Sequence, residues 1–86
     1  MDDAACIREF EKLAGRLGID IRSVPGAPNG LCTVKGKRIL FVDKTLDRES
    51  TLVVYTRAFR GLDLEGIFVA PLLRDLLEAG DDWQDR

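Results

Sequence analysis

The sequence predicts a single α+β domain, in which a small antiparallel sheet with a hairpin is packed by helices. Three segments space their apolar residues as helices do, and short apolar runs broken by glycine and proline lie between the first two. The chain has 86 residues, of which 45% are hydrophobic and 33% charged, a composition typical of one globular domain. We expect the domain to span residues 1–80, followed by an acidic flexible tail over residues 81–86.

The first helix is predicted over residues 3–17. Its apolar residues fall within one arc about 120° wide on a helical wheel, and most of its charged residues lie outside that arc. Asp2 and Asp3 suit the positive N-terminal end of the helix dipole, and Gly18 stands where a left-handed C-terminal cap is expected. The residues on the arc are Cys6, Ile7, Phe10, Leu13, Ala14 and Leu17.

Three strands are predicted to follow this helix. Residues 19–24 alternate in polarity as a half-buried strand does, whereas residues 25–30 hold two prolines and two glycines and indicate a loop. Residues 31–34 and 38–42 are predicted to form a hairpin, because Gly36 supplies the residue that a tight turn needs. The second hairpin strand contains four consecutive apolar residues, so we expect it to be the central strand of the sheet.

The second half of the chain contains two further helices. Asp47 is expected to cap a helix that runs to about Arg60 and stops at Gly61. Residues 67–69 are predicted to be a short extended piece, and Pro71 suits the first turn of a last helix. The predicted order of elements is therefore α-β-β-β-α-(β)-α.

Histidine is absent from the sequence, and its absence limits the available chemistry. The chain lacks the usual general base at neutral pH and the commonest metal ligand. Catalysis by a Ser–His or Cys–His pair and histidine-based zinc chemistry are excluded within one chain. Cys6 and Cys32 cannot form a zinc cage alone, and without an export signal they indicate reduced thiols in the cytoplasm. We expect no metal and no cofactor.

The net charge of −2 conceals an uneven distribution. Residues 35–48 carry five basic and two acidic side chains, whereas residues 61–86 carry seven acidic and two basic ones. An acidic balance argues against a nucleic-acid-binding protein, which usually has a basic surplus. No helix has a polybasic face, and no apolar run is long enough to span a bilayer. We expect neither nucleic acid nor a membrane as a partner.

Two groups of residues are candidate binding sites. Lys35, Lys37 and Arg38, at the predicted hairpin turn, are candidates to bind a phosphate or an acidic partner, although such charges also keep an exposed turn soluble. Val53 lies beside two arginines, away from the main apolar face of its helix. Because a short chain has a thin core, this apolar residue favours association with a protein partner, including a twofold homodimer. The alternative is a singly exposed valine, which is normal. The two arginines are Arg57 and Arg60.

These observations favour a small non-catalytic cytoplasmic protein, an interaction module or subunit. Two alternatives stay open: an anion or nucleotide binder that uses the basic hairpin, and a hydrolase-like enzyme that uses Cys32 or a carboxylate pair. Strand alternation predicts Cys32 to be a buried, slowly reacting thiol. Capping explains Asp47, and solvated turns explain Asp63 and Glu65. Asp43, at the end of a strand, has no such explanation from the sequence.

Two stretches of the chain carry a resemblance. Residues 30–44 read GLCTVKGKRILFVDK, and residues 61–74 read GLDLEGIFVAPLLR. Together they resemble a family of small bacterial proteins of unknown function. Those proteins share a Gly-hydrophobic-Cys strand, a basic hairpin, a strand ending in Asp, a helix and a closing Pro-x-x-Arg segment. The resemblance covers roughly residues 4–79; it implies a bacterial cytosolic source and no particular activity.

The order of elements is also similar to the start of compact zinc peptidase domains of the ImmA type. In those domains the helix after the sheet carries a His-Glu-x-x-His zinc motif. The corresponding residues 49–59 here read ESTLVVYTRAF, with no histidine. This second likeness therefore implies neither a bound metal nor peptidase chemistry.

Overall fold

The structure, a computed structural model, describes residues 2–79. It contains three helices and a three-stranded sheet, which confirms the α+β class. The predicted acidic tail, residues 81–86, lies outside the described residues. The elements are α1 (Asp3–Leu17), β1 (Asp20–Val24), β2 (Gly30–Val34), β3 (Lys37–Asp43), α2 (Arg48–Arg60) and α3 (Pro71–Ala79).

Helix α1 begins and ends where its capping residues predict. The Asp2 carboxylate accepts hydrogen bonds from the backbone N–H groups of Ala4 and Ala5, at 3.1 and 3.4 Å, which satisfies donors that the first turn leaves unpaired. At the other end Gly18 has a φ of +71°, the left-handed conformation that closes a helix. Both ends of this helix are therefore set by single residues that the sequence identifies.

The sheet is mixed, and the prediction of a wholly antiparallel sheet was wrong. The strand order is β1-β3-β2, so β3 is central, as predicted. β3 runs antiparallel to β2 across the predicted hairpin but parallel to β1. β1 and β2 run in opposite directions on either side of the loop of residues 25–29, so a strand inserted between them must be parallel to one of the two. Alternation of polarity along residues 19–24 predicts a strand but carries no information on its direction.

The loop of residues 25–29 passes across the end of β3, and Asp43 holds it there. The Asp43 Oδ1 atom accepts hydrogen bonds from the N–H of Gly26 and the N–H and hydroxyl of Thr45, at 2.9, 2.9 and 2.7 Å. The Asp43 N–H donates to the side-chain oxygen of Asn29 at 2.6 Å. The Thr45 and Gly26 hydrogen bonds lower the pKa of the Asp43 carboxyl below its ordinary value. This network explains the carboxylate that the sequence leaves without a role.

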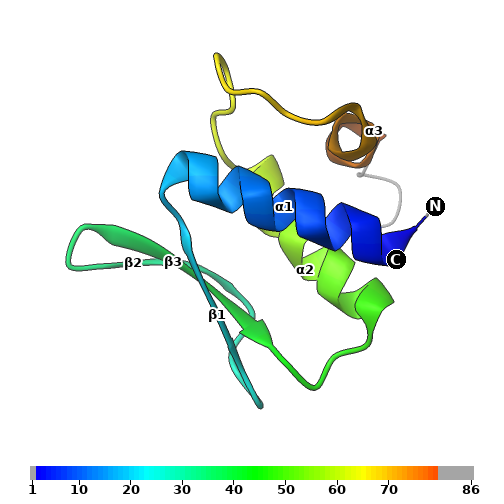
Figure 1. The fold of residues 1–86 in the computed structure, drawn as a ribbon. Helices are drawn as coiled ribbons and strands as arrows, with labels where there is room; N and C mark the ends of the chain where they lie inside the picture. The colour runs from blue at the N-terminus through cyan, green and yellow to red at the C-terminus, as the bar shows by residue number, and fades with distance from the viewer. Residues whose placement is uncertain (1, 80–86) are drawn as a thin grey trace.

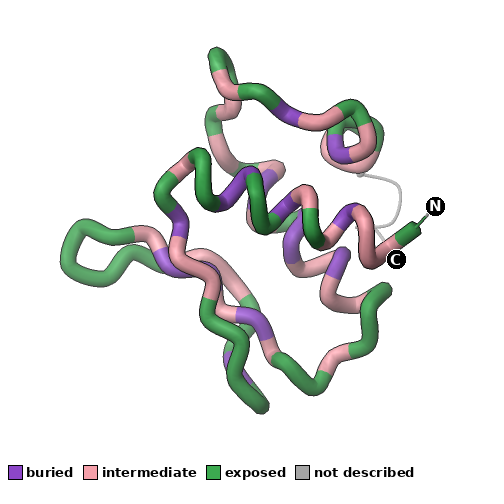
Figure 2. The backbone as a smooth tube through the Cα atoms, viewed as in Figure 1, coloured by how far each residue is buried: buried purple, intermediate pink, exposed green. Residues whose placement is uncertain are grey.

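The helices all lie to one side of the sheet (Figure 1). α1 packs against β1, α2 packs against β3 and β2, and α3 packs on α1 and α2. Between α1 and α2 the Phe10 ring stacks on Tyr55, with centroids 5.6 Å apart, and meets Phe59 at 5.1 Å. Burial, together with the charge of Glu11, raises the pKa of the Tyr55 hydroxyl to about 12, so it stays neutral. Leu40 of β3 is fully buried in the same core cluster. Figure 2 shows that buried residues concentrate where helices face one another and the sheet.

Residues 67–69 are not extended strand, and this prediction was wrong. The Ile67 N–H bonds to the Leu64 carbonyl in a turn, and the segment continues as an irregular connection into α3. Val69 is buried in the core, whereas Phe68 is exposed and lies under the guanidinium of Arg16, 5.2 Å from its ring centroid. Ile67 and Val69 pack with the hydrophobic core, and the segment pairs with none of the three strands of the sheet.

The structure predicts that Asp43 stabilises the sheet through its accepting oxygen. Asp43→Ala should lower the melting temperature at neutral pH, whereas Asp43→Asn, which keeps one accepting oxygen, should lower it less. Because folding lowers the pKa of this carboxyl, its contribution is complete above the unfolded value of about 3.9 and is lost as the pH falls through the folded value. Thermal unfolding followed by circular dichroism should show the difference between wild type and Asp43→Ala shrinking in acid. A difference that stays constant with pH would contradict this role.

Candidate functional site

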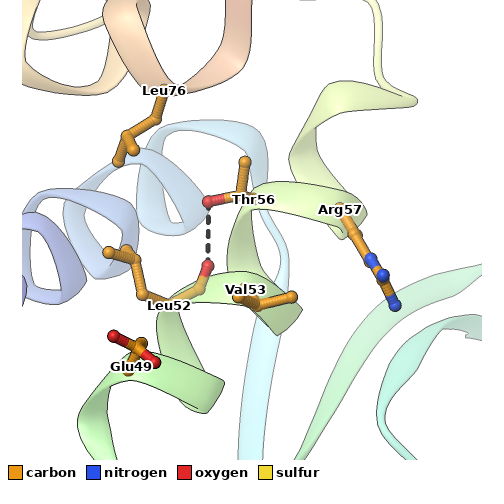
Figure 3. A pocket seen from close by; sticks show the side chains of 6 residues that line it. All are labelled: Glu49, Leu52, Val53, Thr56, Arg57 and Leu76. Carbon is orange, nitrogen blue, oxygen red and sulfur yellow. Dashed lines mark hydrogen bonds between the residues drawn. The ribbon is translucent and has the colours of Figure 1, made fainter. Parts of the chain in front are cut away.

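A hollow of about 370 Å³ opens between α2 and α3, and Val53 lies at its side (Figure 3). We call this hollow the α2–α3 groove. Val53 and Arg57, two of the predicted interaction residues, line it, whereas Arg60 does not. The sequence did not single out the other lining residues, since Leu52 and Leu76 have the spacing of ordinary core positions. The lining residues are Glu49, Leu52, Val53, Thr56, Arg57 and Leu76.

The groove has an apolar floor with one charge towards each end. Glu49, Val53 and Arg57 follow one another at four-residue spacing, so they share one side of α2, with Glu49 and Arg57 about 12 Å apart along the helix axis. The hydroxyl of Thr56 donates to the Leu52 carbonyl at 2.8 Å within the same helix. The floor therefore presents mainly the side chains of Leu52, Val53 and Leu76 to a ligand.

Arg60 holds α2 and α3 together. Its Nε donates to the Leu77 carbonyl and its Nη2 to the Leu76 carbonyl, each at 3.3 Å. A cation near the last carbonyls of a helix satisfies acceptors that have no partner within the helix. Arg60 thus positions the end of α3 from which Leu76 reaches the groove, and its guanidinium is engaged in the fold.

The three basic residues predicted at the hairpin do not form one cluster. Lys35 and Lys37 are exposed at the turn, where Lys35 and Gly36 have φ values of +52° and +81°. Arg38 instead turns towards the helices, and its Nη2 donates to the Leu17 carbonyl at the end of α1, at 2.8 Å. Anion binding at this hairpin stays a prediction that concerns the two lysines, because Arg38 caps a helix.

Cys32 is exposed, so the prediction of a buried thiol was wrong. β2 is an edge strand, and its alternation turns Leu31 towards the helices and Cys32 towards the opposite face of the sheet. The sequence showed the period of the alternation but not which residues point inward. Cys6 is buried in the core, as predicted, and burial together with the nearby charge of Asp3 raises the pKa of its thiol.

Three of the four candidate carboxylates, those of Asp43, Asp47 and Asp63, accept hydrogen bonds from the backbone around them. The Asp47 carboxylate accepts from the Ser50 N–H at 2.8 Å, which confirms the predicted helix cap and lowers the pKa of Asp47. Asp63 accepts from the Glu65 N–H at 3.0 Å in a turn, and Asp43 anchors the loop across β3. Within residues 2–79 no three His, Cys, Asp or Glu side chains are grouped to hold a metal ion.

Comparison with known proteins returned no matching family model, curated protein or solved structure. The resemblance to small bacterial proteins of unknown function therefore stays a prediction. None of the helices within residues 2–79 is both long and apolar enough to cross a membrane. The function is therefore inferred from the groove and the strand edges of this chain.

The two adjacent basic residues of β3 should differ in their effect on stability. Arg38→Met leaves the Leu17 carbonyl without its charged donor, and we expect a loss of about 1–2 kcal/mol in the free energy of unfolding. Lys37→Met, the matched control at an exposed position, should change it by less than about 0.5 kcal/mol. Urea unfolding of both variants measures the difference. Equal effects of the two substitutions would show that Arg38 has no capping role.

The two cysteines should also differ in reactivity. Cys32 is exposed and should react with a thiol reagent in the native protein, whereas buried Cys6 should react only after unfolding. Titration with a chromogenic disulfide should therefore count one fast thiol in the native state and two in denaturant, with the fast one absent from Cys32→Ser. A fast thiol that persists in Cys32→Ser would place Cys6 within reach of solvent.

Proposed function

We propose that this protein is a non-catalytic association module that binds an amphipathic helix of another protein in the α2–α3 groove. The observation that supports this best is the apolar floor, which is open to solvent and has an acid towards one end and a base towards the other. Apolar grooves between packed helices are a common docking site for a helix that lays its apolar face into them.

The charges at the groove favour one orientation of the bound helix. A partner with a basic residue facing Glu49 and an acidic residue facing Arg57 is complementary, and the reverse orientation brings like charges together. Exposed ion pairs add little to affinity, so burial of apolar side chains on Val53 and its neighbours supplies most of the binding. The partner is therefore a helix with apolar residues at i, i+3, i+4 and i+7 and opposite charges at its two ends.

The groove chemistry supports binding in preference to catalysis. Its two charged side chains, Glu49 and Arg57, are two helical turns apart, so they do not form an acid–base pair at one reacting atom. Cys32 lies on the opposite face of the sheet, and the carboxylates of Asp43, Asp47 and Asp63 are engaged with the backbone. Both cysteines are free thiols, which supports a role in the reducing cytoplasm.

A designed peptide tests the groove directly. The probe is a fluorescent synthetic helix with leucines at the stated spacing, lysines at one end and glutamates at the other. Fluorescence anisotropy should show binding that weakens at least tenfold in Val53→Glu, because a buried charge then meets the leucines. Val24→Glu is the matched control, since it makes the same change at an exposed valine of β1, away from the groove.

Orientation gives a second, independent readout. The double variant Glu49→Lys, Arg57→Glu should prefer a peptide whose terminal charges are exchanged, while wild type prefers the original. Equal binding of both peptides to both proteins, or binding that Val53→Glu leaves unchanged, would contradict the proposal. If Val53→Glu instead lowers the oligomeric mass of the protein in solution, the groove binds α2 of a second copy, which carries the same series of Glu49, Val53 and Arg57.

A further inference from the structure

The two edges of the sheet differ in their protection against pairing with another strand. β1 carries an ion pair between Asp20 and Arg22, at 2.8 Å, and is followed by Pro25. β2 reads GLCTV and contains neither a charge nor a proline. Native sheets usually place such residues on a free edge because they discourage strand addition. β2 is therefore the edge that is open to a further strand.

The hairpin geometry identifies the backbone groups that β2 offers. The positive φ values of Lys35 and Gly36 define a type I′ turn, which makes Val34 and Lys37 a hydrogen-bonded pair. Bonded pairs recur at every second residue, so Leu31 and Thr33 direct their N–H and C=O groups away from β3. Among residues 2–79, β2 forms no backbone hydrogen bond with an element other than β3.

We propose that a second copy of this chain pairs with β2 in the antiparallel direction, with Cys32 at the twofold axis. Leu31 then faces the partner copy's Thr33, and Gly30 faces the partner copy's Val34. These two symmetry-related Leu31–Thr33 pairs use the outward backbone groups of both strands and join two sheets into one of six strands. This interface is separate from the α2–α3 groove and leaves each copy with its own groove.

The side chains of β2 are self-complementary in this register. Gly30 has no atom within 4 Å of the position that a Cβ would occupy, so there is open space over it. Val34 is 45% exposed and, across the twofold axis, lies opposite this space. A side chain that covers a glycine of the neighbouring strand stabilises a sheet. Because residues 30–34 carry no charge, pairing of this strand with itself brings no like charges opposite one another within it.

Sedimentation velocity under reducing conditions tests the interface. The wild-type protein should form a dimer in the micromolar range. Thr33→Pro removes one outward N–H from β2 without removing a bond to β3, and should weaken the dimer at least tenfold. Ser23→Pro is the matched control, because it removes an outward N–H from the protected edge strand β1 and should leave the dimer intact. Thr33→Lys, which introduces a charge at the edge, should act as Thr33→Pro does.

Disulfide formation tests the register. A directly opposed pair without hydrogen bonds has its Cα atoms about 4.5 Å apart, within the range that a disulfide spans. Copper phenanthroline should therefore cross-link wild type through Cys32 at low protein concentration. Val34→Cys in a Cys32→Ser background places the two thiols about 13 Å apart and should not cross-link. Cys6 is buried and serves as an internal control.

Three results would overturn the inference. The first is a monomer throughout the micromolar range with no Cys32 cross-link. The second is a dimer whose stability Thr33→Pro and Thr33→Lys leave unchanged. The third is more efficient cross-linking at position 34 than at position 32. A dimer that Val53→Glu dissociates and Thr33→Pro does not would place the second copy in the α2–α3 groove.

Discussion

The insertion of β3 between β1 and β2 is the constraint on which the rest of the structure depends. The insertion requires the loop of residues 25–29 to cross the end of β3, and Asp43 accepts the hydrogen bonds that hold the loop there. Once β3 is central, β2 has a partner on only one side, and its alternation turns Leu31 towards the helices and Cys32 away from them. The exposed thiol and the open edge therefore have the same cause.

The helices depend on the same arrangement. α1 packs on β1 and α2 on the other two strands, so the rings of Phe10, Tyr55 and Phe59 meet between two helices on one face. Two arginines then fix helix ends to neighbouring elements: Arg38 at the end of α1 and Arg60 at the end of α3. Consequently the side of α2 with Val53 stays open to solvent beside α3, where the α2–α3 groove forms.

Local features of the fold follow from the sequence, whereas relations between elements do not. Asp47, Gly18, Gly36 and Pro71 mark helix ends and turns because their effects involve only neighbouring residues. The parallel pairing of β1 was missed because the hydrophobic pattern of a short strand is the same in either direction. The sequence also did not show which residues of β2 face the helices, because a shift of one residue along a strand exchanges its two faces.

The candidate site was predictable only in part. Val53 and Arg57 were identified because they fall outside the apolar arc of a single helix, a property of the sequence alone. Leu76 joins them through the packing of α3, and the sequence carries no signal for that contact. Arg38 and Arg60 look like surface cations in the sequence, yet they donate to carbonyls 21 and 16 or 17 residues away. Long side chains reach such partners only after the fold has formed.

The central claim is that the edge left open by β3 pairs with β2 of a second copy. Amide hydrogen exchange at β2 tests this claim most directly, because it reports on the edge of the sheet without any substitution. Exchange at Leu31 and Thr33 should be fast at low protein concentration and become protected as the concentration rises, while the amides of Ile21 and Ser23, which face outward from β1, stay unchanged. Leu40, at the centre of the sheet, should be protected throughout. Fast exchange at Leu31 and Thr33 at every concentration, with Leu40 protected, would show that the edge remains open and would contradict the account.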